Sequence, residues 1–479
     1  MRYASRRALL WLAISVYCVL VLPRMLSYGM FVDGIVYASI ARNLADNHGS
    51  FWQPYYTATV APVFYDHPPL GFWLQSWAYR LCGDVVYIEA FWGFVAGALI
   101  LMGLGSVWRY SLPQRHALAG TWFPILLFVI IPMTSWILSN NMLENTMTVF
   151  IMSSACTCLL SLRSSKKSLS LIYGLLSGFN IFLAFLVKGP IALFALTTPL
   201  LAVIKRDKIF TKILLTSLYI ILAFLLSLIF MFLNNDEAIN FFSQYINRQL
   251  IASITGVREL ASSRFSIFFA ICSNMIIPLI FGGLLVIVAH RMKRFKISSI
   301  NKRLFLFYLC IALVGSLPIH ISPKQMRWYA FPSFPFYTLA IAIAFNDVAL
   351  TLEKLIEKNK SLYRNVLISS ACILSLSIIL MILGRTYIGR DKDFHNTFSM
   401  KPYDFRKREI ISVYPENLTT QWSLVANIQR KFKASLAKDM GHTYLLSTTE
   451  YKNSSEISSM YKLLYPDNSN KYILFKLND

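Results

Sequence analysis

Charged residues are scarce in this chain of 479 residues: only 14% are Asp, Glu, Lys or Arg, whereas 56% are hydrophobic. A soluble globular domain usually has about 25% charged residues, so this composition excludes one. The chain has no CxxC pair, and six of its seven cysteines lie in predicted apolar spans. An odd number of cysteines in such runs fits small buried hydrophobic residues better than a disulfide framework.

Apolar runs of about 20 residues recur along most of the chain, and each is long enough to cross roughly 30 Å of hydrocarbon. They predict a polytopic α-helical membrane protein. The first run is followed by PRMLSYGMFVDG and not by a small-residue cleavage site, which indicates a retained signal anchor. The eleven predicted spans are residues 8–23, 86–107, 117–138, 146–162, 169–187, 189–204, 213–233, 265–289, 304–321, 328–346 and 366–384.

The net charge of +23 is unevenly distributed among the loops between these spans. Alternate loops and their edges, from MRYASRR to EKLIEKNKSLYR, carry 22 Lys and Arg residues, while the intervening loops carry 9 although two of them are far longer. This positive-inside pattern places the N-terminus of a multi-pass protein in the cytoplasm, and an odd number of spans then places residues 385–479 outside it. It also argues against a nucleic-acid partner, since the positive charge follows membrane topology.

Three predicted outward segments are large enough to hold chemistry: residues 24–85, 234–264 and 385–479. We therefore divide the chain into a transmembrane domain, 1–384, and a small α+β domain, 385–479. No cytosolic loop is large enough to handle a nucleotide sugar, and the chain has no GxSxG, P-loop or HExxH motif. Any catalysis is therefore expected on the outer side of the membrane.

Within these segments the residue patterns predict several elements. Within residues 34–47, Val36, Ile40 and Leu44 are spaced as on an amphipathic helix at the membrane surface, with Arg42, Asn43 and Asp46 away from the apolar face. A second helix, 69–81, begins after a proline, and its aromatic residues suit the membrane interface. In the tail, HTYLLSTTEY and KYILFKL predict strands, and SEISSMYKLLY predicts a helix between them.

Three acids lie on the predicted outer side near the ends of apolar spans: Asp33, Asp66 and Glu144. Asp33 can serve as the N-cap of a helix that begins at Gly34. Glu144 and Asn141 have the spacing of a capping box, and Asp66 can be a solvated loop acid. For Asp33 the two roles do not exclude each other, because one carboxylate oxygen can cap while the other faces a pocket. Asp66 clusters with Tyr65 and His67 directly before a helix fixed by prolines, which would hold them rigidly at the membrane surface.

Cations on the same side run against the charge bias of the chain. Lys188 ends one span, and Lys324 and Arg327 lie in HISPKQMRWYAFPSFP. Snorkelling explains any one of them, but as a group they suit an anionic ligand, and a lipid phosphate is the anion expected there. His67 and His320 can be metal ligands, although a lone histidine is more often a hydrogen-bonded structural residue.

Acids and cations on one side of the membrane favour transfer of a group from a phosphate to a nucleophile. A carboxylate can take the proton of the acceptor. Cations, or a divalent metal held by carboxylates, can stabilise the departing phosphate.

Several motifs together resemble the polyprenyl-phosphate-dependent membrane glycosyltransferases. The resemblance spans roughly residues 20–345 and rests on Asp33, YDHPPLGFWLQ, the acid in NNMLEN, FLVKGPIALFAL and PKQMRWYAFPSFPFYTLAIA. This family includes the aminoarabinose transferases that modify lipid A and, more distantly, the protein O-mannosyltransferases. The resemblance implies a multi-span GT-C fold, an active site outside the cytoplasm and a lipid-linked monophosphate sugar as donor.

The resemblance also implies roles for individual residues. The implied catalytic acids are Asp33 and Asp66. The implied donor-phosphate residues are Lys188, Arg327 and Tyr329, and the grouping of outward cations adds Lys324. The residues that would orient groups or hold a metal are His67, Glu144 and His320. Aminoarabinose transferases usually have Glu-Lys before Pro-Pro, whereas this chain has Asp-His, and the mannosyltransferases favour His, so the sugar and the acceptor stay open.

We therefore predict an enzyme, a glycosyltransferase of the cell inner membrane with a periplasmic C-terminal domain. On the outer face of that membrane it is expected to move a sugar from a polyprenyl phosphate to a lipid or glycan acceptor of the lipid A type, with inversion. A protein O-glycosyltransferase is the alternative within this class, and a lipid or ion transporter is the alternative outside it. Transporters place ionisable groups near the bilayer midplane, whereas the candidate charges here gather at one boundary. The predicted partners are the donor, the acceptor and membrane lipids, with no certain cofactor and a divalent metal as an alternative.

Overall fold

A computed structural model of the protein describes residues 2–111, 118–205, 210–256, 265–291, 301–399, 408–464 and 471–478, and the single residues 263 and 405. The chain divides into two compact units, which are described separately. Unit 1 comprises Met1–Pro23, Asp66–Gly71 and Gly93–Ile382. Unit 2 comprises Arg24–Tyr65, Phe72–Trp92 and Leu383–Asp479.

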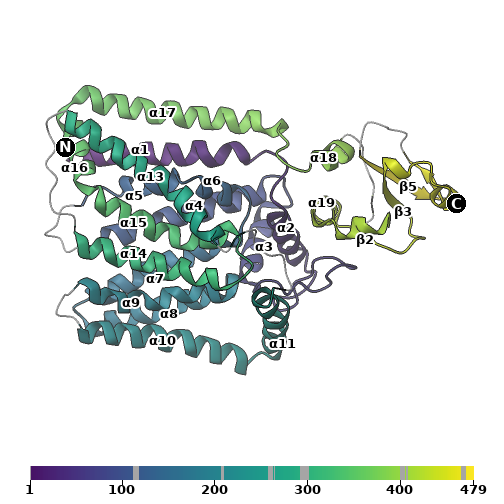
Figure 1. The fold of residues 1–479 in the computed structure, drawn as a ribbon, viewed down its shortest axis with the longest axis horizontal. Helices are drawn as coiled ribbons and strands as arrows, with labels where there is room; N and C mark the ends of the chain where they lie inside the picture. Colours follow the sequence, from purple (N-terminus) through teal and green to yellow (C-terminus); the bar gives the residue numbers. More distant parts are fainter. Residues whose placement is uncertain are drawn as a thin grey trace. The chain divides into compact units, whose positions relative to one another are not determined.

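Unit 1 is a bundle of long helices that lie side by side (Figure 1). Its elements, with α4 beginning in unit 2 and α17 ending there, are α1 Arg2–Val21, α4 Ile88–Arg109, α5 Trp122–Val129, α6 Pro132–Ser139, α7 Leu143–Arg163, α8 Lys167–Lys188, η2 Gly189–Thr197, α9 Thr198–Leu201, η3 Ala202–Lys205, α10 Phe210–Leu233, α11 Asp236–Tyr245, η4 Ile246–Ile251, α12 Ala252–Ile254, α13 Ser266–Arg291, α14 Lys302–Ser316, η5 Leu317–Ile321, η6 Arg327–Ser333, α15 Phe334–Ala344, α16 Asn346–Lys358 and α17 Lys360–Leu383.

Among the described residues, eight helices are long and apolar enough to cross a membrane, or nine if one bent pair is counted as a span. The bent pair is α5 with α6, which meet at 74° within the span predicted at 117–138. The span predicted at 328–346 is divided between η6, a 3₁₀ helix, and the short helix α15. The multi-span helical fold is thus confirmed, while the number eleven stays a prediction.

The apolar stretch Lys167–Ile204 is one candidate span by length and composition, but its polar contacts indicate that it runs across the bundle and back. The Ser161 hydroxyl, at the end of α7, bonds to Ser170 near the start of α8 and to Thr216 near the start of α10. The start of α8 and the start of α10 therefore lie at the same end of the bundle. The 3₁₀ helix η2 rises about 2.0 Å per residue, so the 17 residues from η2 to η3 suffice to return from Lys188 to that end.

Unit 2 combines the predicted first outer loop with the tail. The further elements are α2 Val32–Ala45, α3 Leu70–Cys82 (whose first two residues belong to unit 1), α18 Lys392–Ser399, β1 Ile410–Tyr414, η8 Glu416–Thr420, α19 Trp422–Phe432, β2 Ser435–Ala437, β3 Tyr444–Thr448, η9 Thr449–Tyr451, α20 Ser455–Met460, β4 Tyr461–Leu463 and β5 Tyr472–Leu477, together with the single turns η1 Leu22–Arg24 and η7 Gly384–Thr386. The predicted boundary at 384/385 stays a prediction.

The tail forms one five-stranded sheet in the order β2-β1-β3-β5-β4, which is parallel at β2-β1-β3 and antiparallel at β3-β5-β4. Buried Leu445, Ile473 and Phe475 pack with Ile457 of α20 in its core. The two predicted strands form as β3 and β5, and the predicted helix forms as the shorter α20. The sequence patterns missed β1, α19, β2 and β4.

The helix expected over residues 34–47 forms as α2, but its environment differs from the prediction. Every residue from Gly34 to Leu44 is buried, including Arg42 and Asn43, which were expected on an exposed polar face. Periodicity found the helix and could not reveal that other parts of unit 2 cover its polar residues.

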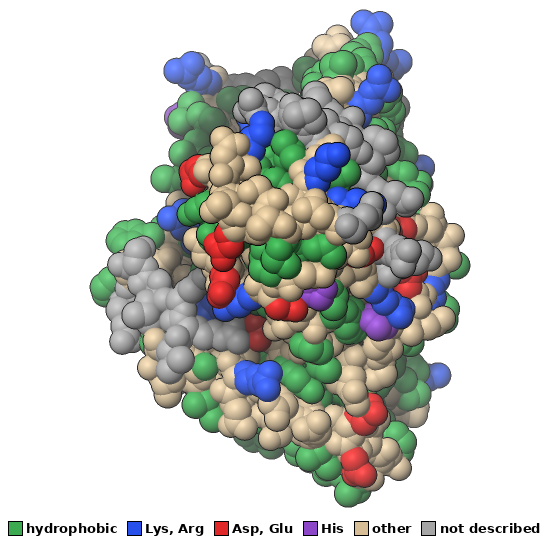
Figure 2. Space-filling view, turned by 90° about the vertical axis from the view of Figure 1, so that its right-hand side faces the viewer, with side chains coloured by type: hydrophobic (Ala, Val, Ile, Leu, Met, Phe, Trp, Pro, Cys, Tyr) green, Lys and Arg blue, Asp and Glu red, His purple; other side chains and the backbone are tan. Residues whose placement is uncertain are grey.

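On the face drawn in Figure 2, cationic and acidic side chains are interspersed among hydrophobic ones.

Candidate active site

Unit 1 contains a cavity of about 450 Å³ that combines an apolar wall with a polar one. The apolar wall is made of Pro190, Ile191, Leu193, Phe194, Leu250, Val314, Gly315, Pro318, Ile319 and Ile321. The polar wall is made of His67, Lys188, Tyr245, Gln249, Ser253, Ser322, Lys324 and Tyr329. Such a cavity suits an amphipathic ligand, because its apolar and polar groups converge on one volume.

The polar wall includes a buried ion pair. The Lys188 Nζ atom lies 2.6 Å from Glu144 Oε1, and the two side chains are 2% and 0% exposed. Lys188 Nζ also lies 5.2 Å from the centre of the Tyr329 ring, a distance typical of a cation–π contact. An ammonium has three donors, so the bond to Glu144 still leaves donors for an anion in the cavity.

This geometry overturns the capping-box interpretation of Glu144. The helix α7 begins at Leu143, and its N-cap is Met142, which makes no side-chain capping bond. The Glu144 Oε2 atom is buried and has no hydrogen-bond partner among the residues that the structure describes. Glu144 therefore acts on Lys188, in keeping with an orienting role.

The turn formed by Lys188, Gly189 and Pro190 places Lys188 at the cavity. Gly189 has φ +76°, a conformation that side chains with a Cβ rarely adopt. A Cβ atom at Gly189 would lie 2.2 Å from the Tyr245 hydroxyl oxygen. The turn therefore needs glycine both for its backbone conformation and for the close approach of Tyr245.

Asp66 and His67 precede the helix α3, and of these two residues His67 lines the cavity. Asp66 is half-buried and lies near Tyr245. Burial, reinforced by the negative charge of Asp66, raises the pKa of Tyr245. Asp66 is thus beside the cavity, next to a tyrosine that stays protonated.

Only some of the residues between 317 and 333 that were predicted to bind phosphate line the cavity. Lys324 and Tyr329 line the cavity, and the backbone N–H of Lys324 donates to the Ser322 hydroxyl at 3.2 Å. Arg327 is exposed and does not line the cavity. His320 also lies outside the lining, and its Nδ1 atom is 3.1 Å from the Leu317 carbonyl oxygen. The cavity therefore unites Lys188, Lys324 and Tyr329, without Arg327.

Asp33 belongs to unit 2, where it lies in the first turn of α2. The helix begins at Val32 and Phe31 is its N-cap, so the prediction that Asp33 caps a helix beginning at Gly34 is wrong. An acid in the first turn still interacts favourably with the helix dipole. The catalytic role of Asp33 stays a prediction.

The alternative of a divalent metal finds no ligand set in the described part of the chain. No three His, Cys, Asp or Glu side chains lie together there in a way that could hold a metal ion. We therefore derive no step through a metal.

Besides Ser322, three polar cavity residues were missed by sequence reasoning: Tyr245, Gln249 and Ser253. They lie on the continuous helical segment formed by α11, η4 and α12, in the second predicted outer segment. Their common spacing of four residues was a signal in the sequence, but nothing in the sequence indicated which face of this segment meets the KGP turn.

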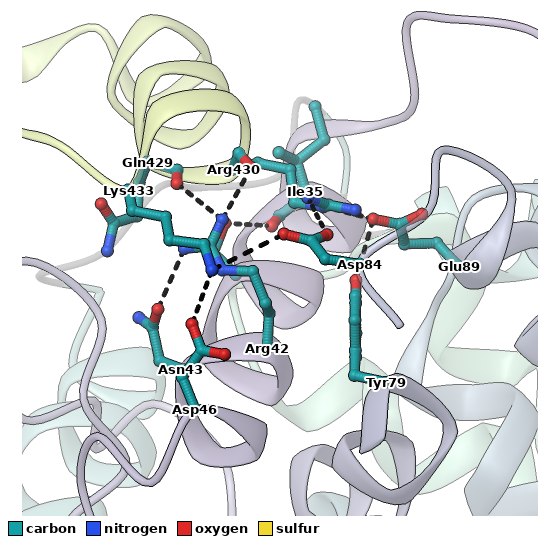
Figure 3. A network of polar contacts seen from close by, with 11 residues as sticks. Ile35, Arg42, Asn43, Asp46, Tyr79, Asp84, Glu89, Gln429, Arg430 and Lys433 are labelled. Carbon is teal, nitrogen blue, oxygen red and sulfur yellow. Dashed lines mark hydrogen bonds and ion pairs between the residues drawn. The ribbon is translucent and has the colours of Figure 1, made fainter. Parts of the chain in front are cut away.

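Unit 2 holds a second polar cluster, the outer-loop network (Figure 3), which ties α19 to α2, α3 and the residues before α4. Arg42 of α2 donates to the carbonyl oxygens of Gln429 and Arg430 at 3.0 and 2.7 Å. Arg430 pairs with Asp84 at 2.8 Å and with Glu89. Lys433 pairs with Asp46 at 2.6 Å, and Tyr79 donates to Glu89 at 2.9 Å.

The three basic residues and three acids of the outer-loop network balance in charge. Burial, together with the neighbouring Arg430, lowers the pKa of Arg42 to about 10. The guanidinium donates to two carbonyls near the end of α19, those of Gln429 and Arg430, and the Gln429 carbonyl also accepts from the backbone N–H of Lys433. The network therefore holds the tail against the predicted first outer loop within unit 2.

The helical bundle with its cavity is similar to membrane glycosyltransferases of the GT-C type. Residues 66–231 match the family described as dolichyl-phosphate-mannose-protein mannosyltransferase. A comparison with curated protein sequences finds no match.

Among solved structures, the fold is similar to that of ArnT from Cupriavidus metallidurans. The form bound to undecaprenyl phosphate has 15% sequence identity and a TM-score of 0.65, with 97% of each chain covered. The apo form has 14% identity and a TM-score of 0.61, with 95% of each chain covered. The apo oligosaccharyltransferase from Archaeoglobus fulgidus has 11% identity and a TM-score of 0.50, with 92% of this chain and 70% of that chain covered.

These findings confirm the predicted family resemblance, the GT-C fold and the enzyme class, a glycosyltransferase. The roles of the individual site residues stay predictions.

Proposed function

We propose that this protein transfers a sugar from a polyprenyl-phosphate donor to a lipid or glycan acceptor of the cell envelope, on the outer face of the inner membrane. One observation carries the proposal: two lysines and an apolar wall share a single cavity in unit 1. A polyprenyl phosphate has this same composition, an anion joined to a long apolar chain. The solved ArnT structure with undecaprenyl phosphate, on a similar fold, supports this choice of ligand.

In this proposal Lys188 and Lys324 bind the donor phosphate. The acceptor oxygen attacks the anomeric carbon as the bond between that carbon and the phosphate oxygen breaks, and the electron pair leaves with the phosphate. The lysine ammoniums stabilise the negative charge that develops there. Glu144 is a positioning residue, because its buried contact fixes the Lys188 ammonium at the cavity wall.

The acceptor's proton goes to a carboxylate when the acceptor is a hydroxyl. Asp66 is the base that we propose, since it lies beside the cavity and next to Tyr245. Asp33 is the second predicted catalytic acid. An acceptor that is itself a phosphate, as in lipid A, needs no strong base, and Asp66 then orients the acceptor. A single displacement of this kind inverts the configuration at the anomeric carbon.

Transfer to protein is the second candidate function, favoured by the family that residues 66–231 match. Such an enzyme would use the same donor and a polypeptide hydroxyl as acceptor. A transporter is less well supported, because the cavity lysines lie at the end of α8 and just beyond η5, away from the middle of a span.

The test compares envelope lipids, glycans and glycoproteins by mass spectrometry in cells that produce the wild-type protein or the Asp66→Asn or Lys188→Met variant. A glycan that disappears in both variants would identify the sugar and the acceptor together. Lys354→Met, near the end of α16 and outside the cavity lining, is the control. An unchanged profile in both site variants, with altered uptake of a solute, would contradict the proposal and favour transport.

A further inference from the structure

The helical segment from α11 to α12 forms one side of the cavity with polar residues at a constant spacing. Tyr245, Gln249 and Ser253 follow one another at intervals of four, and all three line the cavity. We call these three residues the polar stripe. Neither the sequence motifs nor the proposed chemistry assigns a role to it.

The backbone of this segment explains how the polar stripe stays on one face. In an α-helix of 3.6 residues per turn, residues four apart drift by about 40° around the axis. Residues Ile246–Ile251 form a π-helical turn, η4, which has more residues per turn and so reverses this drift. Such π turns are rare and often occur at functional sites.

The two ends of the polar stripe lie close to the segments that carry the two cavity lysines, Lys188 and Lys324. At one end, the Tyr245 hydroxyl packs against Gly189, the residue after Lys188. At the other end, the Ser253 carbonyl oxygen accepts a hydrogen bond of 3.3 Å from Ser322, whose hydroxyl also accepts from the backbone N–H of Lys324. A ligand whose anion is held by the lysines therefore meets neutral hydrogen-bonding groups beside them.

Gln249, in the middle of the polar stripe, has unused hydrogen-bonding capacity. The residue is only 8% exposed, and its Oε1 atom is buried without a partner among the parts of the chain described here. A buried acceptor without a donor costs free energy. The terminal torsion of an amide is broad, so the carboxamide can turn its oxygen or its nitrogen toward a ligand.

We propose that the polar stripe binds the saccharide of the donor and that Gln249 determines which sugar is accepted. This inference rests on the proposed function. A phosphodiester has oxygen acceptors and no donors, whereas a sugar hydroxyl both donates and accepts. An amide between two neutral hydroxyl-bearing residues matches the sugar, and the lysines match the phosphate. A site built to bond a hydroxyl discriminates strongly against a sugar that lacks it in that position.

The test uses Gln249→Met, which keeps an unbranched side chain of similar size and removes the amide. Gln244→Met is the matched control, since Gln244 is on the same segment and does not line the cavity. Binding to purified full-length protein is measured for undecaprenyl phosphate alone and for undecaprenyl phosphate bearing glucose, mannose or galactose. Mannose differs from glucose only in the configuration of the C2 hydroxyl, and galactose differs from glucose only in that of the C4 hydroxyl.

For Gln249→Met we expect affinity for undecaprenyl phosphate within about twofold of wild type. We expect the ratio of affinities between the preferred sugar donor and its epimers to fall at least tenfold, while Gln244→Met retains the wild-type ratio. Ser253→Ala, a smaller change, should lower the same ratio in the same direction.

Three outcomes would overturn the inference. If Gln249→Met weakens binding of the bare lipid phosphate and of all sugar donors equally, Gln249 serves the phosphate or the fold. If no ratio changes while the wild-type protein distinguishes the epimers, another residue selects the sugar and the proposed function stands. If the wild-type protein binds neither the lipid phosphate nor its sugar esters, the proposed function fails as well.

Discussion

The buried pair of Glu144 and Lys188 allows stability and ligand binding to be separated by mutation. With 2.6 Å between Nζ and Oε1, the gross attraction is about 6 kcal/mol at an effective dielectric constant of 20. Much of that attraction offsets the cost of removing both charges from water. Removal of one partner leaves the other charge buried and unpaired, which typically costs about 3–5 kcal/mol.

We therefore expect Lys188→Met and Glu144→Met each to lower the free energy of unfolding by about 3–5 kcal/mol. The double variant removes both charges and replaces them with apolar groups of similar size, which is often close to neutral. We expect it to be within about 1.5 kcal/mol of wild type, so that the double-mutant cycle gives a coupling of at least about 4.5 kcal/mol. Equilibrium unfolding in detergent, followed by tryptophan fluorescence, measures these values.

The variants should rank differently in their affinity for the lipid phosphate than in their free energy of unfolding. Lys188→Met and the double variant should both bind undecaprenyl phosphate at least tenfold more weakly, a loss of about 1.4 kcal/mol or more, because both lack the ammonium. A double variant as unstable as Lys188→Met alone would refute the buried pairing. A double variant that regained lipid-phosphate binding along with stability would refute the role of Lys188 as a phosphate ligand.

Other predictions concern single positions in both units. Gly189→Ala should lower the free energy of unfolding by at least about 2 kcal/mol, since the new Cβ collides with the Tyr245 hydroxyl. The control is Gly283→Ala, whose new Cβ would have no atom within 4 Å. It should be neutral or slightly stabilising in the same unfolding assay. Arg42→Ala should make the tail susceptible to limited proteolysis, because the Gln429 and Arg430 carbonyls lose the guanidinium that ties α19 to α2. Arg385→Ala, at an exposed position, should leave the digestion pattern unchanged. Burial, with the charge of nearby Lys431, lowers the pKa of His395 to about 4, so the folded state disfavours protonation of this side chain. The contribution of His395 to the free energy of unfolding should therefore be fully present above the unfolded pKa of about 6.5. It should decline as the pH falls from there toward 4. Unfolding measured from pH 7.5 to 5 should show this decline in wild type and less of it in His395→Gln, and an equal decline in both proteins would refute the assignment.

The sequence predicted those parts of the fold that follow from local patterns. Apolar runs longer than 20 residues indicated the long helices, and alternation in the tail indicated β3 and β5. The strands β2 and β4 have only three residues each, too few for a period to be recognised. The helix α2 was found, but the burial of Arg42 depends on α19, which lies almost 390 residues further along the chain.

The candidate site shows the same division between local and long-range information. The motifs identified Lys188, Lys324 and Tyr329, which line one cavity, and Asp66, which lies beside it. The motifs could not indicate that Glu144 pairs with Lys188, because these two residues of α7 and α8 lie 44 positions apart in the sequence. The spacing that suggested a capping box for Glu144 was compatible with both roles, and only the packing of α7 against α8 distinguishes them.

The central claim, that the cavity in unit 1 binds a lipid-linked phosphate, is tested most directly by photo-cross-linking. A polyprenyl phosphate with a photoreactive group next to its phosphate would be bound to the purified protein, irradiated, and located by peptide mass spectrometry. The account predicts labels on residues 188–194, 245–253 and 314–329, which are competed by undecaprenyl phosphate and absent with the corresponding polyprenyl alcohol. Labels spread over the exposed apolar faces of α10, α13 and α17, alike for phosphate and alcohol, would contradict it.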